Sequence, residues 1–270
     1  MFLIEALKAI ILGIVEGITE WLPISSTGHM ILLNEFMNTA EGFFGSQVFL
    51  YVIQLGAILA ILTLYFNKLN PFAPSKSAKE KNDTWHMWFK VIIACLPAAV
   101  IGLLLNDFMD TFSTPIVVSA MLIIYGIAFI VVENLNHKTK ISTIEDLDYK
   151  TAFLIGAFQV LSIIPGTSRS GATILGAIIL GTSRAVAAEF SFFLAIPVML
   201  GVSILKLTTC AYPTGAEWIL LLISMVVAYI VSILSVKFLT NYVRKHNFKF
   251  FAYYRIVLGV ILIAYFILSH

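Results

Sequence analysis

The sequence predicts an all-α integral membrane protein that forms a single membrane domain over residues 1–270. Three observations predict this fold class: a composition too apolar for water, six apolar stretches long enough to cross a bilayer, and an internal repeat. Together they predict an inverted-topology repeat with two re-entrant helix hairpins plus six transmembrane helices.

The composition indicates that lipid is the solvent. Hydrophobic residues make up 60% of the chain and charged residues 12%, whereas an average soluble domain has about 25% charged residues. A soluble chain of 270 residues cannot hide that much apolar surface. The net charge of +2 is too small to indicate a nucleic-acid partner, so none is expected.

Six apolar stretches approach or reach the length of about 20 residues that a spanning helix needs. They are residues 46–66, 88–105, 115–132, 186–207, 218–239 and 252–268. The loops at 67–87, 134–150 and 240–250 contain several Lys and Arg residues, and the loop at 106–114 contains none. The positive-inside rule therefore places the three basic loops in the cytoplasm.

This orientation predicts two re-entrant segments. The loops at 134–150 and 240–250 can share one side of the membrane only if residues 150–182 enter the bilayer and return to the side from which they came. The same reasoning makes residues 1–37 a hairpin that enters from the opposite side. Each half of the chain is then one hairpin followed by three spans.

An internal repeat supports the same division. A shift of 143 positions pairs Gly13 with Gly156 and Ser25 with Ser168, and a shift of 133 pairs Gly126 with Gly259. The predicted first repeat covers residues 1–133 and the second covers 150–270, in the opposite orientation. In such folds the binding site forms at the interface between the repeats, near the middle of the membrane.

The first hairpin carries the polar segment "EGITEWLPISSTGHM", residues 16–30. Glu16 and Glu20 are four positions apart, so they lie on one face of a helix, and ionisable residues inside a bilayer indicate function. Ser25, Ser26 and Thr27 precede His29 in the same loop. A hydroxyl, an imidazole and a carboxylate are the parts of an activated nucleophile. The spacing leaves Ser26, His29 and an activated water as alternatives. Trp21 is expected in the interfacial aromatic belt or, alternatively, facing lipid at the mouth of the site.

The second hairpin carries "PGTSRSGAT", residues 165–173, in which hydroxyls and glycines surround an arginine. Such groups at the start of a helix suit phosphate oxygens. The segment is not a Walker A loop, so a nucleotide is not indicated. We expect this loop to bind a phosphate group through Gly166, Thr167, Ser168, Arg169, Ser170 and Thr173.

The two loops complement each other chemically. The first brings two acids and a histidine, and the second brings Arg169, so they indicate one composite site. Glu16 and Glu20 could hold a divalent cation, Mg²⁺ or Ca²⁺, between themselves and the phosphates, which would relieve their mutual repulsion.

The two segments resemble the signature segments of bacterial undecaprenyl-diphosphate phosphatases of the bacitracin-resistance type. The E-x-x-x-E spacing is met by Glu16 and Glu20, and P-G-x-S-R-S-x-x-T is met from Pro165 to Thr173. The resemblance implies a multi-pass enzyme of the bacterial inner membrane, dependent on a divalent cation, with its active site facing the periplasm. It would convert undecaprenyl diphosphate to the monophosphate, which recycles the lipid carrier for cell-wall synthesis and confers bacitracin resistance.

The resemblance also implies roles for individual residues. Glu16 and Glu20 would bind metal or serve as base, and Ser26 or His29 would be the nucleophile. Arg169 would grip the diphosphate together with the neighbouring hydroxyls, with Ser25 and Thr27 on the facing loop. The polyprenyl diphosphate and membrane lipids are thus the expected partners. The oligomeric state stays open, with a homodimer as one alternative.

A different function class fits some of the same features. Inverted repeats with broken helices also build transporters, so an ion-coupled transporter or flippase of an anionic lipid headgroup is the alternative, with Glu16 and Glu20 as its coupling-ion site. Turnover without bond cleavage would distinguish it from an enzyme.

Overall fold

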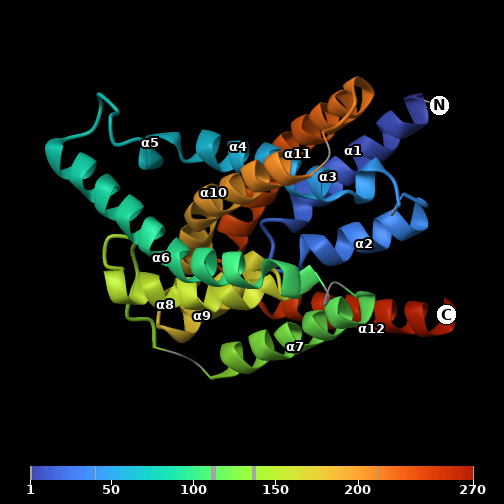
Figure 1. The fold of residues 1–270 in the computed structure, drawn as a ribbon. Coiled ribbons are helices and arrows are strands. Elements are labelled where there is room, and N and C mark those ends of the chain that lie inside the picture. Colours follow the sequence, from blue (N-terminus) through green and yellow to red (C-terminus); the bar gives the residue numbers. More distant parts are fainter. Residues whose placement is uncertain (1, 40, 111–113, 136–137, 211, 270) are drawn as a thin grey trace.

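A computed structural model describes residues 2–39, 41–110, 114–135, 138–210 and 212–269. Within these ranges the chain forms helices and connecting loops and no β-strand (Figure 1). The α-helices are α1 (Phe2–Thr19), α2 (Ser26–Phe36), α3 (Gln47–Val52), α4 (Gln54–Leu64), α5 (Phe66–Leu69), α6 (Ala78–Asp110), α7 (Pro115–Asn134), α8 (Tyr149–Val160), α9 (Arg169–Ile179), α10 (Arg184–Thr209), α11 (Gly215–Tyr242) and α12 (Lys249–Ser269). Two 3-10 turns, Phe43–Gly45 and Leu161–Ile163, precede α3 and follow α8.

Six helical segments among the described residues are long and apolar enough to cross a membrane. They are Gln47–Leu64, Ala78–Leu105, Pro115–Asn134, Arg184–Thr209, Gly215–Tyr242 and Lys249–Leu268. Each overlaps one of the six stretches predicted from the sequence, so the prediction of an all-α, multi-pass membrane protein is confirmed. The first segment is divided at Ile53, where α3 ends and α4 begins.

The helices on either side of the two polar loops are shorter or more polar than the spans. α2 and α9 each contain 11 residues and are about 16 Å long, roughly half the thickness of the hydrocarbon core. α8 contains 12 residues, and α1 carries Glu5, Lys8 and Glu16 within its 18 residues. The chain reverses between α1 and α2 and again between α8 and α9, so each polar loop lies between two paired helices, and of these four helices α2, α8 and α9 are short.

Each of the helices that precede the polar loops packs against a span from the other half of the chain. α1 lies along α11, and α8 lies along α6 (Figure 1). Glycines permit the close approach. A Cβ atom on Gly13 would lie 2.6 Å from the Ser224 carbonyl oxygen of α11, and one on Gly156 would overlap the Ala94 carbonyl of α6. The Ser224 hydroxyl also donates to the Ala9 carbonyl at 2.9 Å.

The contact between α7 and α12 is reciprocal. A Cβ on Gly126 would lie 2.6 Å from Ile256 Cγ1 and 2.8 Å from the Ala252 carbonyl oxygen. A Cβ on Gly259 would lie 2.7 Å from Ile123 Cγ1 and 2.8 Å from the Ser119 carbonyl oxygen. A shift of 133 positions converts each set of contacts into the other. Small residues at such crossings let two backbones approach closely in a membrane.

The largest apolar core surrounds α9 and α10 and so supports the second polar loop. Phe190, Phe192 and Phe193 of α10 are fully buried there. The Trp21 ring of the first loop packs edge-on against Phe192, with ring centroids 5.5 Å apart. The core thereby joins the first polar loop to the helix that follows the second.

The α7–α12 contact can be tested with paired alanine substitutions. Gly126→Ala and Gly259→Ala should each lower the free energy of unfolding by about 1–3 kcal/mol, because the added Cβ meets backbone and a branched side chain. Thermal unfolding of the purified protein in detergent measures the loss. Gly201→Ala is the matched control, since its Cβ would meet nothing within 4 Å. Equal unfolding temperatures for all three variants would contradict the packing.

Candidate functional site

Each polar loop ends in a serine that caps the next helix. The Ser25 hydroxyl accepts the Gly28 amide at 3.4 Å at the start of α2, and the Ser168 hydroxyl accepts the Gly171 amide at 3.1 Å at the start of α9. Ser25 has φ 71° and Ser168 has φ 72°. A left-handed conformation costs a non-glycine residue about 1–3 kcal/mol and is concentrated at functional sites. The two loops, 143 positions apart, thus share one unusual geometry.

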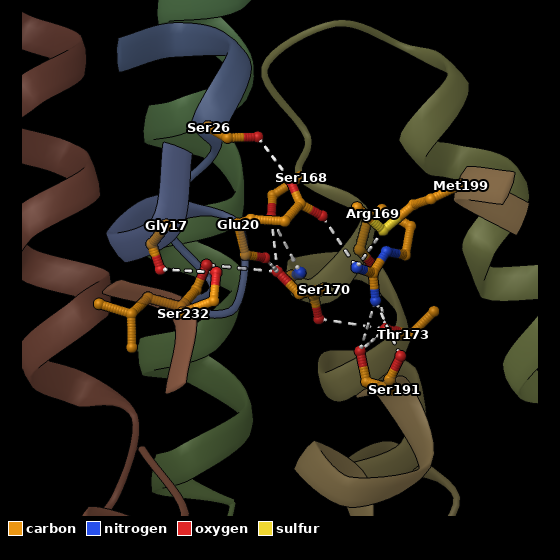
Figure 2. A network of polar contacts seen from close by, with 12 residues as sticks. Gly17, Glu20, Ser26, Ser168, Arg169, Ser170, Thr173, Ser191, Met199 and Ser232 are labelled. Atoms are coloured by element: carbon orange, nitrogen blue, oxygen red, sulfur yellow. Dashed lines mark hydrogen bonds and ion pairs between the residues drawn. The ribbon is translucent and has the colours of Figure 1, made fainter. Parts of the chain in front are cut away.

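Glu20 joins the two loops. Its Oε2 accepts a hydrogen bond of 2.8 Å from the Ser26 hydroxyl, and its Oε1 accepts one of 2.8 Å from Arg169 Nη2 (Figure 2). Ser26 and Arg169 are the first residues of α2 and α9, respectively. The side chains of Arg169 and Glu20 are only 11% and 8% exposed. One buried carboxylate is therefore held by the first turns of two helices.

Arg169 is fixed by several further contacts. Its Nη1 donates to the Ser191 carbonyl at 2.8 Å, and the Ser191 hydroxyl lies 2.7 Å from that of Thr173. The guanidinium carbon lies 5.8 Å from the centre of the Trp21 ring, within the range of a cation–π interaction. These contacts hold the guanidinium plane in place, which suits recognition of planar or tetrahedral oxyanions.

Ser170 links the two loops through the backbone. Its hydroxyl lies 3.2 Å from the carbonyl oxygens of both Glu20 and Leu22, to which it donates. The side chain is 1% exposed. The residue next to Arg169 thus helps to position Glu20.

Arg255 of α12 is a second buried arginine at the site. Its guanidinium donates to the carbonyls of Pro23 in the first loop at 3.0 Å and of Gly166 and Thr167 in the second at 3.0 and 2.9 Å. Two weaker bonds of 3.4 Å reach carbonyls of α7. Arg255 is fully buried and forms no ion pair within the described ranges. It holds both loops and α7 together through their backbones.

His29 is turned toward a different partner. Its Nδ1 lies 2.8 Å from the Ser25 carbonyl, which can only accept, so Nδ1 carries the proton in the neutral ring. Nε2 then accepts a hydrogen bond of 2.7 Å from the Tyr254 hydroxyl. No hydrogen bond joins His29 to Ser26 or Glu20 in the part of the chain that the structure describes. The hydroxyl, carboxylate and imidazole predicted to act together are therefore divided: Ser26 is bonded to Glu20, and His29 is bonded to Tyr254.

The remaining predicted residues differ in their placement. Thr173 is fully buried, and its hydroxyl bonds the Arg169 carbonyl at 3.0 Å. Thr167 is also fully buried. Thr27 is exposed, and its side chain forms no hydrogen bond with any described residue.

Several buried polar atoms around the two loops have no hydrogen-bond partner among the residues described. They are Glu16 Oε1, Trp21 Nε1, Thr167 Oγ1, Arg169 Nε and both polar atoms of the Gln159 side chain. Buried polar groups normally have partners, so these unpaired atoms are a feature of the site that the rest of the described chain does not satisfy. Gln159 is the residue that the repeat pairs with Glu16.

The carboxylates present fit a cation that also binds the substrate. No cluster of three or more His, Cys, Asp or Glu side chains suited to a metal occurs within the ranges described. Glu16 Oε1 is nevertheless buried with no hydrogen-bond partner among the described residues, and Glu16 lies one helical turn before Glu20. Mg²⁺ is commonly held by one or two carboxylates and by substrate phosphates, which is the set that these residues and a diphosphate would supply.

The sequence did not predict Ser191, Tyr254 or Arg255 as residues of the site, and it placed Trp21 wrongly. Trp21 is fully buried, with Arg169 over its ring, so both expectations, an interfacial position and a lipid-facing one, were wrong. Ser191 lies within an apolar stretch and carries no charge that would single it out. Arg255 could have been found, because an arginine inside the predicted span 252–268 is itself a signal of function.

The fold and the site define a multi-pass α-helical membrane protein with a buried, charged site where the two polar loops meet. The sequence profile of the family described as "Bacitracin resistance protein BacA" matches residues 9–261. The chain belongs to this family, which confirms the family prediction.

Several curated relatives are similar over nearly the whole chain. Undecaprenyl-diphosphatase of Enterococcus faecalis is 56% identical over 269 residues, covering 97% of this chain and 98% of the relative. The protein of the same name from Latilactobacillus sakei is 56% identical, with coverage of 97% and 98%. Undecaprenyl-diphosphatase 1 of Clostridioides difficile is 54% identical, with coverage of 98% of both chains.

The role of Arg255 can be tested by a conservative substitution. Arg255→Lys keeps the positive charge but cannot reach carbonyls of both loops and α7 at once. It should lower the free energy of unfolding by about 2–4 kcal/mol, because buried carbonyls lose their donors. Thermal unfolding in detergent measures this loss, with the exposed Lys245→Gln as control. An unchanged unfolding temperature would show that Arg255 does not hold the loops together.

Proposed function

We propose that this protein hydrolyses undecaprenyl diphosphate to undecaprenyl phosphate and inorganic phosphate, recycling the lipid carrier for cell-wall synthesis and conferring bacitracin resistance. The family and the names of the relatives support this activity. The single observation that carries it is the buried Glu20 carboxylate shared by the Ser26 hydroxyl and the Arg169 guanidinium, both at 2.8 Å. Glu20 is therefore bonded both to a hydroxyl that can act as nucleophile, that of Ser26, and to a cation that can bind phosphate oxygens, that of Arg169. Glu20 itself can act as the base.

The diphosphate binds between the first turns of α2 and α9. Helix N-termini present free amides and a positive dipole end to anions. Arg169 contacts the terminal phosphoryl group, assisted by the hydroxyls or amides of Ser25, Thr27, Gly166, Thr167, Ser168 and Ser170. Thr173, whose hydroxyl bonds the Arg169 carbonyl, supports Arg169 from within α9. The prenyl chain stays in lipid, so the protein need accommodate only the headgroup.

Ser26 is the nucleophile in this proposal. Its oxygen forms a bond to the terminal phosphorus while the bond from that phosphorus to the bridging oxygen breaks. The hydroxyl proton passes to Glu20, and undecaprenyl phosphate leaves with the bridging oxygen. Water then cleaves the phosphoserine, which releases inorganic phosphate and returns a proton to Ser26. Arg169 neutralises the equatorial oxygens, which is the main task in phosphoryl transfer.

His29 assists from the other side of the first loop. Its unprotonated Nε2 faces the Tyr254 hydroxyl at 2.7 Å, so this pair can position or activate the water of the second step. His29 is also the alternative nucleophile, since a neutral imidazole nitrogen can attack phosphorus if Tyr254 moves away.

A divalent cation, Mg²⁺ or Ca²⁺, would be held by Glu16 and Glu20 together with the phosphates. When bound, it would neutralise charge on the diphosphate. Glu16 would contribute Oε1, which has no partner among the described residues, and Glu20 would keep its contacts with Ser26 and Arg169.

The architecture proposed for this activity is an inverted repeat of residues 1–133 and 150–270, with α1–α2 and α8–α9 as re-entrant hairpins. The matched caps at Ser25 and Ser168 support it, as do the reciprocal glycine contacts of α7 and α12. The protein would lie in the bacterial inner membrane with its active site open to the periplasm. A homodimer stays a prediction.

The nucleophile can be identified by trapping the phosphoenzyme formed from undecaprenyl diphosphate labelled on its terminal phosphate. A phosphoserine at Ser26 should be found, stable to acid, and Ser26→Ala should lower phosphate release on the order of 10³-fold. Arg169→Lys should lower it by about 10²–10³-fold through lost charge stabilisation. Glu41→Gln, an exposed carboxylate outside the site, should have wild-type activity.

The same experiment can contradict the assignment. An acid-labile phosphohistidine at position 29, with activity retained in Ser26→Ala, would make His29 the nucleophile. Lipid movement across vesicles without any phosphate release would favour the transporter alternative.

The cation can be tested by chelation and by Glu16→Gln. Chelation should abolish phosphate release by the wild type and restore it on addition of Mg²⁺ or Ca²⁺. Glu16→Gln should weaken metal binding, measured by calorimetry in the presence of a non-hydrolysable diphosphate, by about tenfold or more, because one anionic ligand is lost. Full activity after chelation would refute the cation site.

A further inference from the structure

A polar pocket lies at the far end of α9 from Arg169. Its volume is about 540 Å³, and its polar lining includes Thr139, Thr182, Ser183, Arg184 and Arg244. Ile178, in the last turn of α9, also lines it. Because α9 begins at Arg169 and is about 16 Å long, the pocket is separate from the candidate active site.

The pocket carries a net positive charge. Its one carboxylate, Glu133, accepts hydrogen bonds from Arg184 Nε at 3.0 Å and Nη2 at 2.5 Å, and from the Phe248 amide at 2.9 Å. Glu133 is therefore neutralised and serves to orient Arg184, whose side chain is still 43% exposed. Arg244 is exposed and forms no hydrogen bond or ion pair with any described residue. The pocket is thus lined by two guanidinium groups, those of Arg184 and Arg244, and by one carboxylate, that of Glu133, which is already paired with Arg184.

Uncharged donors complete the lining. Thr182 is 4% exposed, and its hydroxyl has no partner among the residues described. Ser183 caps α10, so the first amides of that 26-residue helix also face this corner. Helix amides of the first turn have no carbonyl partner within the helix and favour anions. The segment between α9 and α10 is held in place by a hydrogen bond of 2.8 Å from the Ser183 amide to the Ile141 carbonyl.

Apolar residues form the rest of the wall. Val132, Ile178 and Val243 line the pocket, and their neighbours Val131 and Ile179 are 51% and 39% exposed. An anionic group at the arginines would therefore have apolar surface beside it for acyl chains. The basic loops that contain Thr139 and Arg244 are the ones predicted to be cytoplasmic, where the leaflet is rich in anionic lipid.

We propose that this pocket binds a phosphate group, supplied by the headgroup of an anionic phospholipid in the surrounding leaflet. Arg184, Arg244, the Thr182 hydroxyl and the α10 amides contact the phosphate oxygens. The site neither shares residues with the diphosphate site nor depends on the proposed hydrolysis. Free inorganic phosphate has the same chemistry and is the other source that the test separates.

Calorimetric titration of the full-length protein in non-ionic detergent tests this proposal. The probes are short-chain phosphatidylglycerol, phosphatidylcholine of the same chain length, and inorganic phosphate. Phosphatidylglycerol should bind in preference to phosphatidylcholine. Arg244→Gln and Thr182→Val should each weaken its binding by about tenfold, because a donor to a charged oxygen is lost. Lys245→Gln, an exposed cation outside the lining, should bind like the wild type.

Thr182→Val also guards against a folding artefact. It is nearly isosteric and removes a hydroxyl that bonds to no described residue, so the unfolding temperature without lipid should not fall. Inorganic phosphate binding with the same dependence on the variants would support the pocket and make free phosphate the ligand. Equal affinities for phosphatidylglycerol and phosphatidylcholine would overturn the proposal. So would equal effects of Arg244→Gln and Lys245→Gln on phosphatidylglycerol binding, or wild-type affinity for phosphatidylglycerol in Thr182→Val.

Discussion

The structure of the site depends on one buried ion pair, between Glu20 and Arg169, whose atoms are 2.8 Å apart. A carboxylate inside a membrane protein is costly unless it is paired and hydrogen-bonded. Glu20 obtains its cation from a residue 149 positions away, so neither hairpin can satisfy its own charge alone. Electrostatics therefore requires the two polar loops to meet, and their meeting creates the site.

Backbone contacts then hold the loops at the distance this pair needs. Arg255 binds carbonyls of both loops, and Ser170 binds carbonyls of the first. Breaking one partner of a buried polar network leaves the others unsatisfied. Among the described residues, Glu16 Oε1 and Arg169 Nε still have no hydrogen-bond partner, so two polar atoms of the site remain for a ligand. That combination is expected of an active site and not of a structural salt bridge.

Much of the fold could be predicted from the sequence because the bilayer imposes it. Six apolar stretches had to become helices, since backbone groups in lipid must be satisfied internally. The loop residues Glu20, Ser26 and Arg169 were predictable because charged and hydroxyl side chains stand out in a chain this apolar. The partners within the site were not predictable. Ser191 and Tyr254 reach it through packing between distant helices, and spacing along the chain holds no information on which hydroxyl His29 contacts.

A double-mutant cycle on Glu20 and Arg169 tests the central claim most directly. Phosphate release from undecaprenyl diphosphate would be compared for Glu20→Gln, Arg169→Gln and the double variant, each verified to be folded by thermal unfolding. If the two residues act as one unit, the double variant should lose about as much kcat/KM as the worse single variant. Losses that multiply in the double variant would show that the two residues act independently, which would contradict a site built on their ion pair.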